Sequence, residues 1–351
     1  MEPMQRRAMS HPQHKSVAVI GAGLAGAACA HAFASVGYSV IVYEQAAHTA
    51  AGASGVPTAL FAPSISADDA PHSRLLRRGV HVLLQELHRL TDAGLLEVGV
   101  DWAMTGVLER CIRSDKKLPS AWLDPADPVG VQSRFAGEIQ STMLAREVPQ
   151  IFHGAAGWVN PRRLINAWLA HPNIQLQTLQ RVEHPYSLQA DLVVIAAGHQ
   201  TSEVWPTCKT LLQSIRGQVE WGRSVLPTQL QHPINGLGHF VQTSSLWLAG
   251  ATFQRDEIDM QPRMRDVEKN FEKLATLMPE ITDLVLARLR AQAQSWVGVR
   301  AAQKNRQPLV QKIESSEHHN LWVCAGLGSR GLSLAALCAQ EVLSTALSPS
   351  I

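Results

Sequence analysis

The 351-residue sequence has few charged residues and almost no excess of either sign. Charged residues make up 17% of the chain and hydrophobic residues 46%, so apolar material suffices for a large core and intrinsic disorder is excluded. The formal net charge of +2 lies within residues 1–15, which we expect to form a flexible basic tail, and the remaining 28 basic and 28 acidic residues balance. A neutral body excludes a uniformly basic nucleic-acid-binding surface.

The sequence also lacks paired cysteines, a secretory signal and a clear membrane span. Its five cysteines are widely spaced without a CxxC pair, which argues against a disulfide framework and a zinc site and favours a reducing compartment. The longest apolar stretch, residues 17–36, is interrupted by glycines and by His31. We therefore expect a cytoplasmic protein that holds no metal and contacts no membrane. The cysteines are Cys29, Cys111, Cys208, Cys324 and Cys338.

The N-terminal part has the order of elements typical of a dinucleotide-binding fold. An apolar strand over 16–20 leads into Gly21-Ala22-Gly23-Leu24-Ala25-Gly26, which is followed by a helix over 27–36. A second strand over 38–43 ends at Glu44. This complete strand, turn, helix, strand and acid series predicts a dinucleotide site more strongly than the glycines alone do.

Each of these residues has a specific task in such a site. Gly21 permits the tight turn, Gly23 lets the backbone approach a pyrophosphate, and Gly26 allows close packing of helix and strand. The helix N-terminus offers N–H donors to the phosphates. Glu44 can accept hydrogen bonds from the adenosine ribose, and an acid there disfavours the 2′-phosphate of NADP.

A second glycine-rich turn lies near the C-terminus. A strand over 320–325 is followed by Gly326-Leu327-Gly328-Ser329-Arg330-Gly331 and a helix over 332–347. Two such turns suit a large cofactor that is held at two places. The small-residue stretch 49–55 either runs close to that cofactor or is an ordinary loop.

Between the two ends, the pattern predicts a mixture of helices and strands. Residues 73–98 show helical spacing, Asn160 and Pro161 begin a further helix, and 111–150 are irregular and proline-rich. Further strands are expected over 191–198, 214–221, 246–253 and 296–301, and a helix over 265–289 that breaks near Pro279.

Short motifs over residues 17–345 occur in the order of one known family. They are GASG at 52–55, GWVNP at 157–161, AGHQ at 197–200, GQV at 217–219, GAT at 250–252, GVR at 298–300 and GLGSRGL at 326–332. With them the chain resembles FAD-dependent oxidoreductases of the D-amino-acid oxidase type. Among these it is most similar to the C-terminal oxidase half of the bifunctional tRNA 5-methylaminomethyl-2-thiouridine biosynthesis family.

The resemblance implies an α/β fold, α+β overall, in which a Rossmann-like FAD-binding domain is interleaved with a mixed-sheet substrate domain. It implies an FAD domain over 16–80, 155–213 and 298–351, and a substrate domain over 81–154 and 214–297. FAD would contact Gly21, Gly23, Leu24, Ala25, Gly26, Glu44, Ala53, Ser54, Gly55, Ala197, Gly198, Gly326, Gly328, Ser329, Gly331 and Leu332.

The implied activity is oxidation of a CH–NH bond: removal of the carboxymethyl group of 5-carboxymethylaminomethyl uridine at the tRNA wobble position, by hydride transfer to flavin, with release of glyoxylate. A free amino acid such as glycine, sarcosine or a D-amino acid is the alternative substrate, and a flavin-binding protein without catalysis is a third reading. The methyltransferase half of the bifunctional family is not part of this sequence, so we expect any methylation to need another polypeptide.

Three residues are candidates for the chemistry. Arg300 matches the position that holds the substrate carboxylate, a task that suits a guanidinium fork, although a structural ion pair is the alternative. Arg330 either faces flavin or substrate or is an ordinary surface arginine, and His199 either faces the cofactor or caps its strand. We name no general base, because hydride transfer to flavin depends more on alignment.

The chain departs from the family where substrate binding is concerned. Gln303, Lys304 and Asn305 replace a Thr-Arg-Asp sequence, and Phe253 stands where a tyrosine is expected, so an altered substrate is an open reading. Residues 284–313 contain no acid, and their basic residues form either a rim for tRNA around Arg300 or a solvated face. The five candidate rim residues are Arg288, Arg290, Lys304, Arg306 and Lys312.

Overall fold

A computed structural model describes the chain over residues 15–110, 123–124, 127–131, 141–144, 150–224, 230–314 and 320–348. Residues 1–14, Cys111 and most of the stretch 111–150 lie outside the described residues, and with them nearly all of the expected basic tail and of the expected irregular region.

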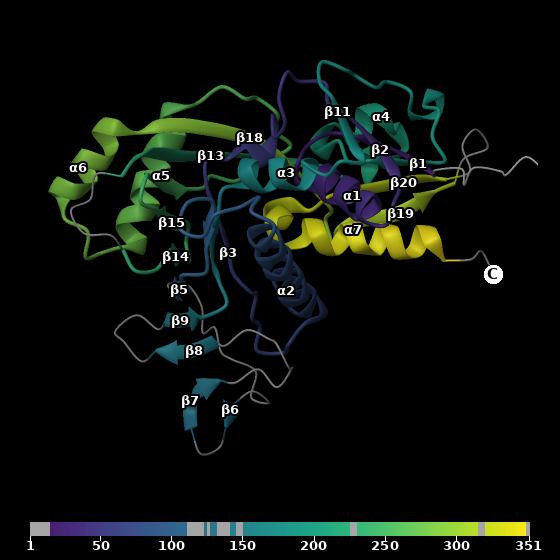
Figure 1. The fold of residues 1–351 in the computed structure, drawn as a ribbon. Helices are drawn as coiled ribbons and strands as arrows, with labels where there is room; N and C mark the ends of the chain where they lie inside the picture. The colour runs from purple at the N-terminus through teal and green to yellow at the C-terminus, as the bar shows by residue number, and fades with distance from the viewer. Residues whose placement is uncertain are drawn as a thin grey trace, which may run out of the picture.

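A six-stranded sheet collects strands from both ends of the chain (Figure 1). All neighbours are parallel except β19, which runs antiparallel to β20 at one edge. The central strands are almost wholly apolar and buried, as expected of a sheet that is covered on both faces. In spatial order the strands are β11 (Ile174–Gln177), β2 (Ser39–Tyr43), β1 (Ser16–Ile20), β12 (Leu192–Ile195), β20 (Leu321–Ala325) and β19 (Leu309–Ile313).

Helices α1 (Leu24–Ser35), α3 (Pro161–Leu169) and α7 (Gly331–Leu347) pack on this sheet, and α2 (Pro71–Asp92) packs on α7 and α3. Small residues permit the close approach. A Cβ on Gly79 of α2 would lie only 2.3 Å from the carbonyl oxygen of Ser333 in α7. Asn160 caps α3 by accepting a hydrogen bond from the Arg163 N–H, as its sequence position predicts. The helix expected over 73–98 ends earlier, because Gly94 turns the backbone to a φ of +73° directly after α2.

A second, larger sheet of mixed direction lies on the other side of the molecule (Figure 1). Helices α5 (Met264–Leu277) and α6 (Asp283–Gln292) pack on it, and Trp247, Phe271 and Leu289 are in its core. Its strands are β5 (Val107–Arg110), β8 (Ser141–Leu144), β9 (Gln150–His153), β13 (Gln213–Arg223), β14 (Ile234–Asn235), β15 (His239–Gln242), β16 (Leu246–Gly250), β17 (Gln254–Arg255) and β18 (Gln294–Ala302).

Shorter elements complete the description. Strands β3 (Ala59–Phe61), β10 (Gly157–Val159) and β4 (Trp102–Ala103) form a three-stranded sheet, and β6 (Leu123–Asp124) pairs with β7 (Asp127–Val131). A short α4 (Thr201–Val204) follows β12.

Strand β18 connects the two main sheets. It pairs along its whole length with β13 in the larger sheet, and its last residue, Ala302, forms a bridge with Leu327 just beyond β20 of the first sheet. Residues at the end of β18 are therefore held beside the C-terminal glycine-rich turn.

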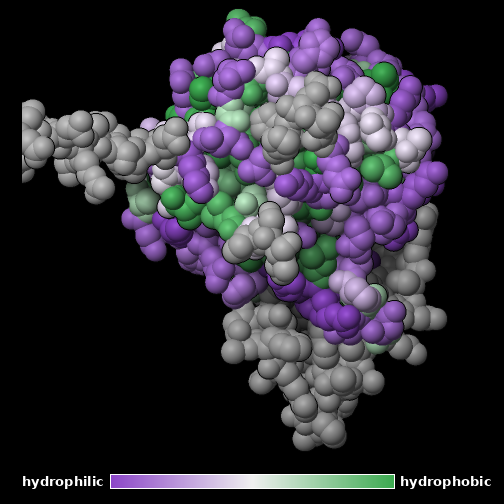
Figure 2. Space-filling model, turned by 90° about the vertical axis from the view of Figure 1, so that its right-hand side faces the viewer, coloured by the Kyte–Doolittle hydropathy of each residue, from purple (hydrophilic) through white to green (hydrophobic). Residues whose placement is uncertain are grey.

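The surface at the α7 end of the molecule is mostly hydrophilic, with hydrophobic residues scattered across it (Figure 2). Across the described ranges, no helix has the length and apolar character to cross a membrane. The apolar stretch 17–36 is divided between β1, a turn and α1.

Candidate active site

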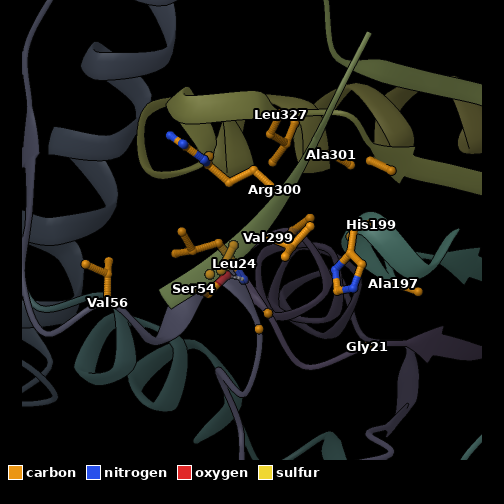
Figure 3. A pocket seen from close by; sticks show the side chains of 18 of the residues that line it. Gly21, Leu24, Ser54, Val56, Ala197, His199, Val299, Arg300, Ala301 and Leu327 are labelled. Carbon is orange, nitrogen blue, oxygen red and sulfur yellow. Dashed lines mark hydrogen bonds between the residues drawn. The ribbon is translucent and has the colours of Figure 1, made fainter. Parts of the chain in front are cut away.

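A large cavity of about 910 Å³ lies where the two glycine-rich turns meet the end of β18 (Figure 3). This volume is near the upper end of the roughly 300–1,000 Å³ common for ligand clefts, as a large cofactor requires. Every residue that the sequence singled out for FAD or catalysis lines the cavity, except Gly26 and Gly55. These two act through packing: a Cβ on Gly26 would lie 1.8 Å from the Gly21 carbonyl oxygen, and one on Gly55 2.4 Å from that of Ala50.

In the turn between β1 and α1, the backbone lies close to a neighbouring strand end, as the glycines of the turn predict. Gly21 has a φ of +104°, and a Cβ there would lie 2.7 Å from the carbonyl oxygen of Ala196. At the start of α1 the Leu24 N–H donates to Ser54 Oγ over 3.0 Å. The stretch 49–55 thus reaches the helix N-terminus, where a phosphate would be held.

Glu44 is positioned by backbone donors at the end of β2. Its Oε2 accepts from the Ala22 N–H over 2.8 Å and its Oε1 from the Ala46 N–H over 2.9 Å. The side chain is only 8% exposed, yet it lines the cavity. Each carboxylate oxygen keeps lone pairs for further donors, such as ribose hydroxyls.

The C-terminal turn approaches the same cavity from another direction. Gly326 and Gly328 have φ values of +72° and +57°, and α7 begins at Gly331. A Cβ on Gly331 would be 3.7 Å from the side chain of Leu24, so the N-terminal ends of α1 and α7 lie close together. The N-terminal ends of both helices, which carry partial positive charge, therefore lie at one region, as two-point binding of a large anionic cofactor requires.

Arg300 on β18 is a partly buried guanidinium in the cavity wall, and its removal from water lowers its pKa. In the part of the chain that the structure describes, no carboxylate lies within ion-pair distance of it, and its closest polar partner is the Thr252 carbonyl oxygen at 3.5 Å. A Cβ on Gly217 of β13 would lie 2.6 Å from Arg300 Nη2, so the glycine makes room for the side chain. A buried cation without a counter-charge favours an anionic ligand.

Arg330 also lines the cavity, from the turn before α7. Burial lowers its pKa, and the carboxylate of Glu109 acts in the opposite direction.

His199 follows β12 and lines the cavity at a different place. Burial lowers its pKa, whereas Glu203 and a hydrogen bond with the Val299 backbone act in the opposite direction. Figure 3 shows its imidazole well apart from the guanidinium of Arg300. The structure therefore does not bring these two predicted catalytic side chains together.

Two residues that the sequence did not single out lie near Arg300. His239 lines the cavity at the start of β15, and burial, together with the charges of Arg300, Lys273 and Arg330, lowers its pKa to about 4. Lys273 on α5 donates from Nζ to the Ala251 carbonyl oxygen over 2.7 Å. Each is a lone residue in the sequence, and no local pattern connects them. Together they make this end of the cavity electropositive, with a neutral imidazole inside it.

The expected basic rim does not exist as one patch. Arg288 and Arg290 lie on α6, whereas Lys312 lies on β19 at the other end of the molecule (Figure 1). Arg290 pairs with Glu268 over 2.6 Å, and none of the five rim residues lines the cavity. Lys304 and Arg306 lie in the turn after β18. The structure therefore does not support one rim of these five residues, because proximity in sequence across a helix and two strands does not mean proximity in space.

The departures from the family at 303–305 also lie outside the cavity. The Gln303 side chain donates to the carbonyl oxygens of Gln307 and Pro308, and Asn305 Oδ1 accepts from the Gln307 N–H. These residues stabilise a turn. Phe253, by contrast, lines the cavity.

Comparison with solved structures places this arrangement in a known class. The structure is similar to glycine oxidase from Geobacillus kaustophilus, with a TM-score of 0.72 and 18% identity over 95% of both chains. It is also similar to iminodiacetate oxidase from Chelativorans sp. BNC1, with a TM-score of 0.69 and 18% identity over 95% of this chain and 96% of the other. The fold is that of the FAD-dependent amine and amino-acid oxidases, which confirms the predicted mixed α/β class.

Sequence comparison gives the family. Residues 16–344 match the DAO family, described as FAD dependent oxidoreductase, and the chain belongs to this family. It is 37% identical over 94% of its length to the tRNA 5-methylaminomethyl-2-thiouridine biosynthesis bifunctional protein MnmC of Polaromonas naphthalenivorans. Identity to the MnmC protein of Thiobacillus denitrificans is 32%, again over 94% of this chain. The chain spans 56% of the length of each of these relatives.

The side chains and backbone of the cavity fit the cofactor of that family. FAD needs an acidic acceptor for the ribose, N–H donors for the pyrophosphate and close backbone approach, and the cavity provides Glu44, the α1 N-terminus beside Ser54, and Gly21 with Gly23. The cofactor is therefore FAD, as predicted, and the chain is an FAD-dependent oxidoreductase.

Proposed function

We propose that this protein removes the carboxymethyl group of 5-carboxymethylaminomethyl(-2-thio)uridine at the tRNA wobble position, giving 5-aminomethyl uridine and glyoxylate. The supporting observation is Arg300, a partly buried guanidinium without a carboxylate partner among the described residues, in the same cavity as the glycine-rich turns. Relatives with 32–38% identity carry names that refer to biosynthesis of this class of tRNA nucleoside.

Bound FAD would supply the acceptor for a hydride from the methylene carbon between the amine and the carboxylate. Arg300 binds the carboxylate through two parallel N–H donors and thereby orients that methylene. The resulting imine is hydrolysed by water, which releases glyoxylate and leaves the aminomethyl group on the base.

The charges around Arg300 contribute to the same step. Hydride loss requires the substrate amine in its neutral form, and nearby cations disfavour an ammonium ion. Arg300, Arg330 and Lys273 surround this end of the cavity, and His239 with a pKa of about 4 adds no charge at neutral pH. The site therefore favours a substrate with a bound carboxylate and an unprotonated amine.

The test is mass spectrometry of nucleosides from a strain that lacks this protein, complemented with wild type or with Arg300→Ala. We expect the carboxymethylaminomethyl nucleoside to accumulate in the deletion strain and to be consumed again only with wild type. Arg300→Ala should retain FAD, measured by its absorbance spectrum, and lose turnover. Unchanged nucleoside levels in the deletion strain would refute the proposed function, and turnover by Arg300→Ala would refute the role of Arg300.

Flavin reduction by defined substrates separates the alternatives. Reduction by the modified tRNA but not by glycine or sarcosine supports the proposal, the reverse result assigns the protein to free amino acids, and reduction by none of them indicates a protein that only binds flavin. We further propose that the aminomethyl product passes to a methyltransferase, which is either a separate protein or another segment, and that the reaction takes place in the cytoplasm.

A further inference from the structure

Phe253 is an exposed aromatic ring in the wall of the cavity. Its side chain is 53% exposed although it lines the same cavity as Arg300. Met260, 43% exposed, lines the cavity with it. Because both side chains line the cavity and are open to solvent, a bound substrate can contact them.

Hydrogen bonds and ion pairs fix the loop that follows Phe253. Arg216 is wholly buried and donates to the carbonyl oxygens of Asp259 and Gln261, each over 2.6 Å. It also pairs with Asp266 over 2.6 Å, and both side chains are 0% exposed. Arg263 ties the segment again through Glu257. Because these bonds fix the loop, they also hold Phe253 in its exposed position.

Two cations lie over the ring at cation–π distance. The guanidinium carbons of Arg300 and Arg255 lie 5.5 Å and 5.7 Å from its centroid. Arg255 is exposed, and no carboxylate of the described residues pairs with it. The carboxylates of Glu257 and Asp259 both pair with Arg263, which offsets one of their two negative charges. An exposed aromatic ring beside free guanidinium groups is the arrangement that binds unstacked bases and phosphates of single-stranded nucleic acid.

We infer that Phe253 stacks on the uracil ring of the wobble nucleoside while Arg300 holds its carboxylate, and that Arg255 meets the adjoining phosphate. The inference rests on the proposed function and names the residue that selects a nucleoside over a free amino acid. The carboxylate carbon is joined to the ring through a methylene, an amine and a second methylene, which at about 1.5 Å per bond spans roughly 5 Å. The Arg300 guanidinium and the Phe253 ring lie 5.5 Å apart, so a linker of this length lets one substrate contact both groups.

The experiment compares two ligands of the flavin-loaded protein. One is an anticodon stem–loop with the modified uridine. The other is sarcosine, measured by its turnover or, if it is not oxidised, as a competitor of the stem–loop. Binding of the labelled stem–loop is followed by fluorescence anisotropy, and turnover by flavin reduction. Phe253→Ala should raise the Kd and the KM for the stem–loop by about 5- to 100-fold, the range expected for loss of one stacked base. It should change the constants for sarcosine far less than those for the stem–loop, and leave the FAD spectrum unchanged.

Two variants provide the controls. Ile258→Ala removes another exposed apolar side chain, 64% exposed, from the same loop but outside the cavity and should change nothing. Phe253→Tyr restores an aromatic face and should restore binding.

Equal losses for the stem–loop and for sarcosine would overturn the inference, since Phe253 would then only shape the pocket, and so would an unchanged Kd for the stem–loop. If the wild-type protein neither binds nor oxidises the stem–loop, the proposed function itself fails. This outcome differs from failure of the Phe253 inference, because it is seen without any substitution.

Discussion

At the scale of single residues, the cavity is defined by charges that have no local counter-charge. Arg300 faces the Thr252 carbonyl oxygen instead of a carboxylate, and His239 lies among three cations. Burial of such groups costs stability that a purely structural role would not require. We interpret this cost as the consequence of building a site for an anionic carboxylate.

His239 makes folding sensitive to acid in a defined pH range. Its pKa is about 4 in the folded protein against 6.5 in an unstructured chain, so the unfolded state binds the proton first as the pH falls. The free energy of unfolding should therefore be unaffected above about pH 6.5 and decrease between about pH 6.5 and pH 4.

His239→Gln should remove this contribution, so the stability of wild type relative to the variant falls by up to about 2 kcal/mol between about pH 7 and pH 4.5. Urea unfolding of both proteins at the two pH values measures this, and taking the difference cancels the titration of other groups. A difference that does not change with pH would contradict the assignment.

At the scale of elements, glycines decide how closely the helices and strands of the site approach. Gly26 lets α1 lie against the turn at Gly21, Gly79 brings α2 to α7, and Gly217 leaves space for Arg300. The sequence identified the first of these from its spacing. The other two lie in an ordinary helix and strand, where only the neighbouring element shows why a side chain is excluded.

Gly26→Ala should destabilise the protein and weaken FAD binding, because its Cβ would lie 1.8 Å from a backbone oxygen and α1 would have to move. Overpacking of this kind costs typically about 1–3 kcal/mol. Chemical unfolding and FAD titration measure the two effects. Gly52→Ala is the matched control for stability, since its Cβ would meet no atom within 4 Å. Equal stability of the two variants would contradict the packing argument.

At the scale of the whole molecule, the cavity joins the two ends of the chain. The turn after β1 and the turn before α7 are about three hundred positions apart in sequence, yet both line it together with the end of β18. A ligand that contacts all three segments stabilises the first sheet and its connection to the second at the same time. The division into an FAD domain and a substrate domain, with the boundaries given above, remains a prediction.

Removal of FAD should lower the Tm of the whole protein in one cooperative transition. A ligand at about 100 times its Kd stabilises the folded state by roughly 2.7 kcal/mol. Thermal unfolding with and without flavin measures the shift, and Glu44→Gln should reduce it because an acceptor for the ribose hydroxyls is weakened. Unfolding in two separate steps, with only one that depends on FAD, would show that the ends of the chain are not coupled through the cofactor.

The sequence predicted the elements of the nucleotide-binding side well. Strand β1, helix α1, strand β2, the cap of α3, strand β20 and helix α7 lie within a few residues of their expected positions. Apolar runs and glycine spacing are local properties, so they can be read along the chain. Strands β11 and β19 were missed, because both are short, partly polar edge strands whose pairing partners lie elsewhere in the sequence.

The sequence by itself predicted the class of cofactor and the turn residues expected to contact it, because the steric demands of a phosphate-binding turn act between neighbours in the chain. Only the tertiary structure decided which charges meet. It separated the acid-free stretch 284–313 into α6, β18 and β19, and it placed His239 and Phe253 beside Arg300. Coulomb and packing energies depend on distances in space, and β18 sets those distances by running from one sheet to the other.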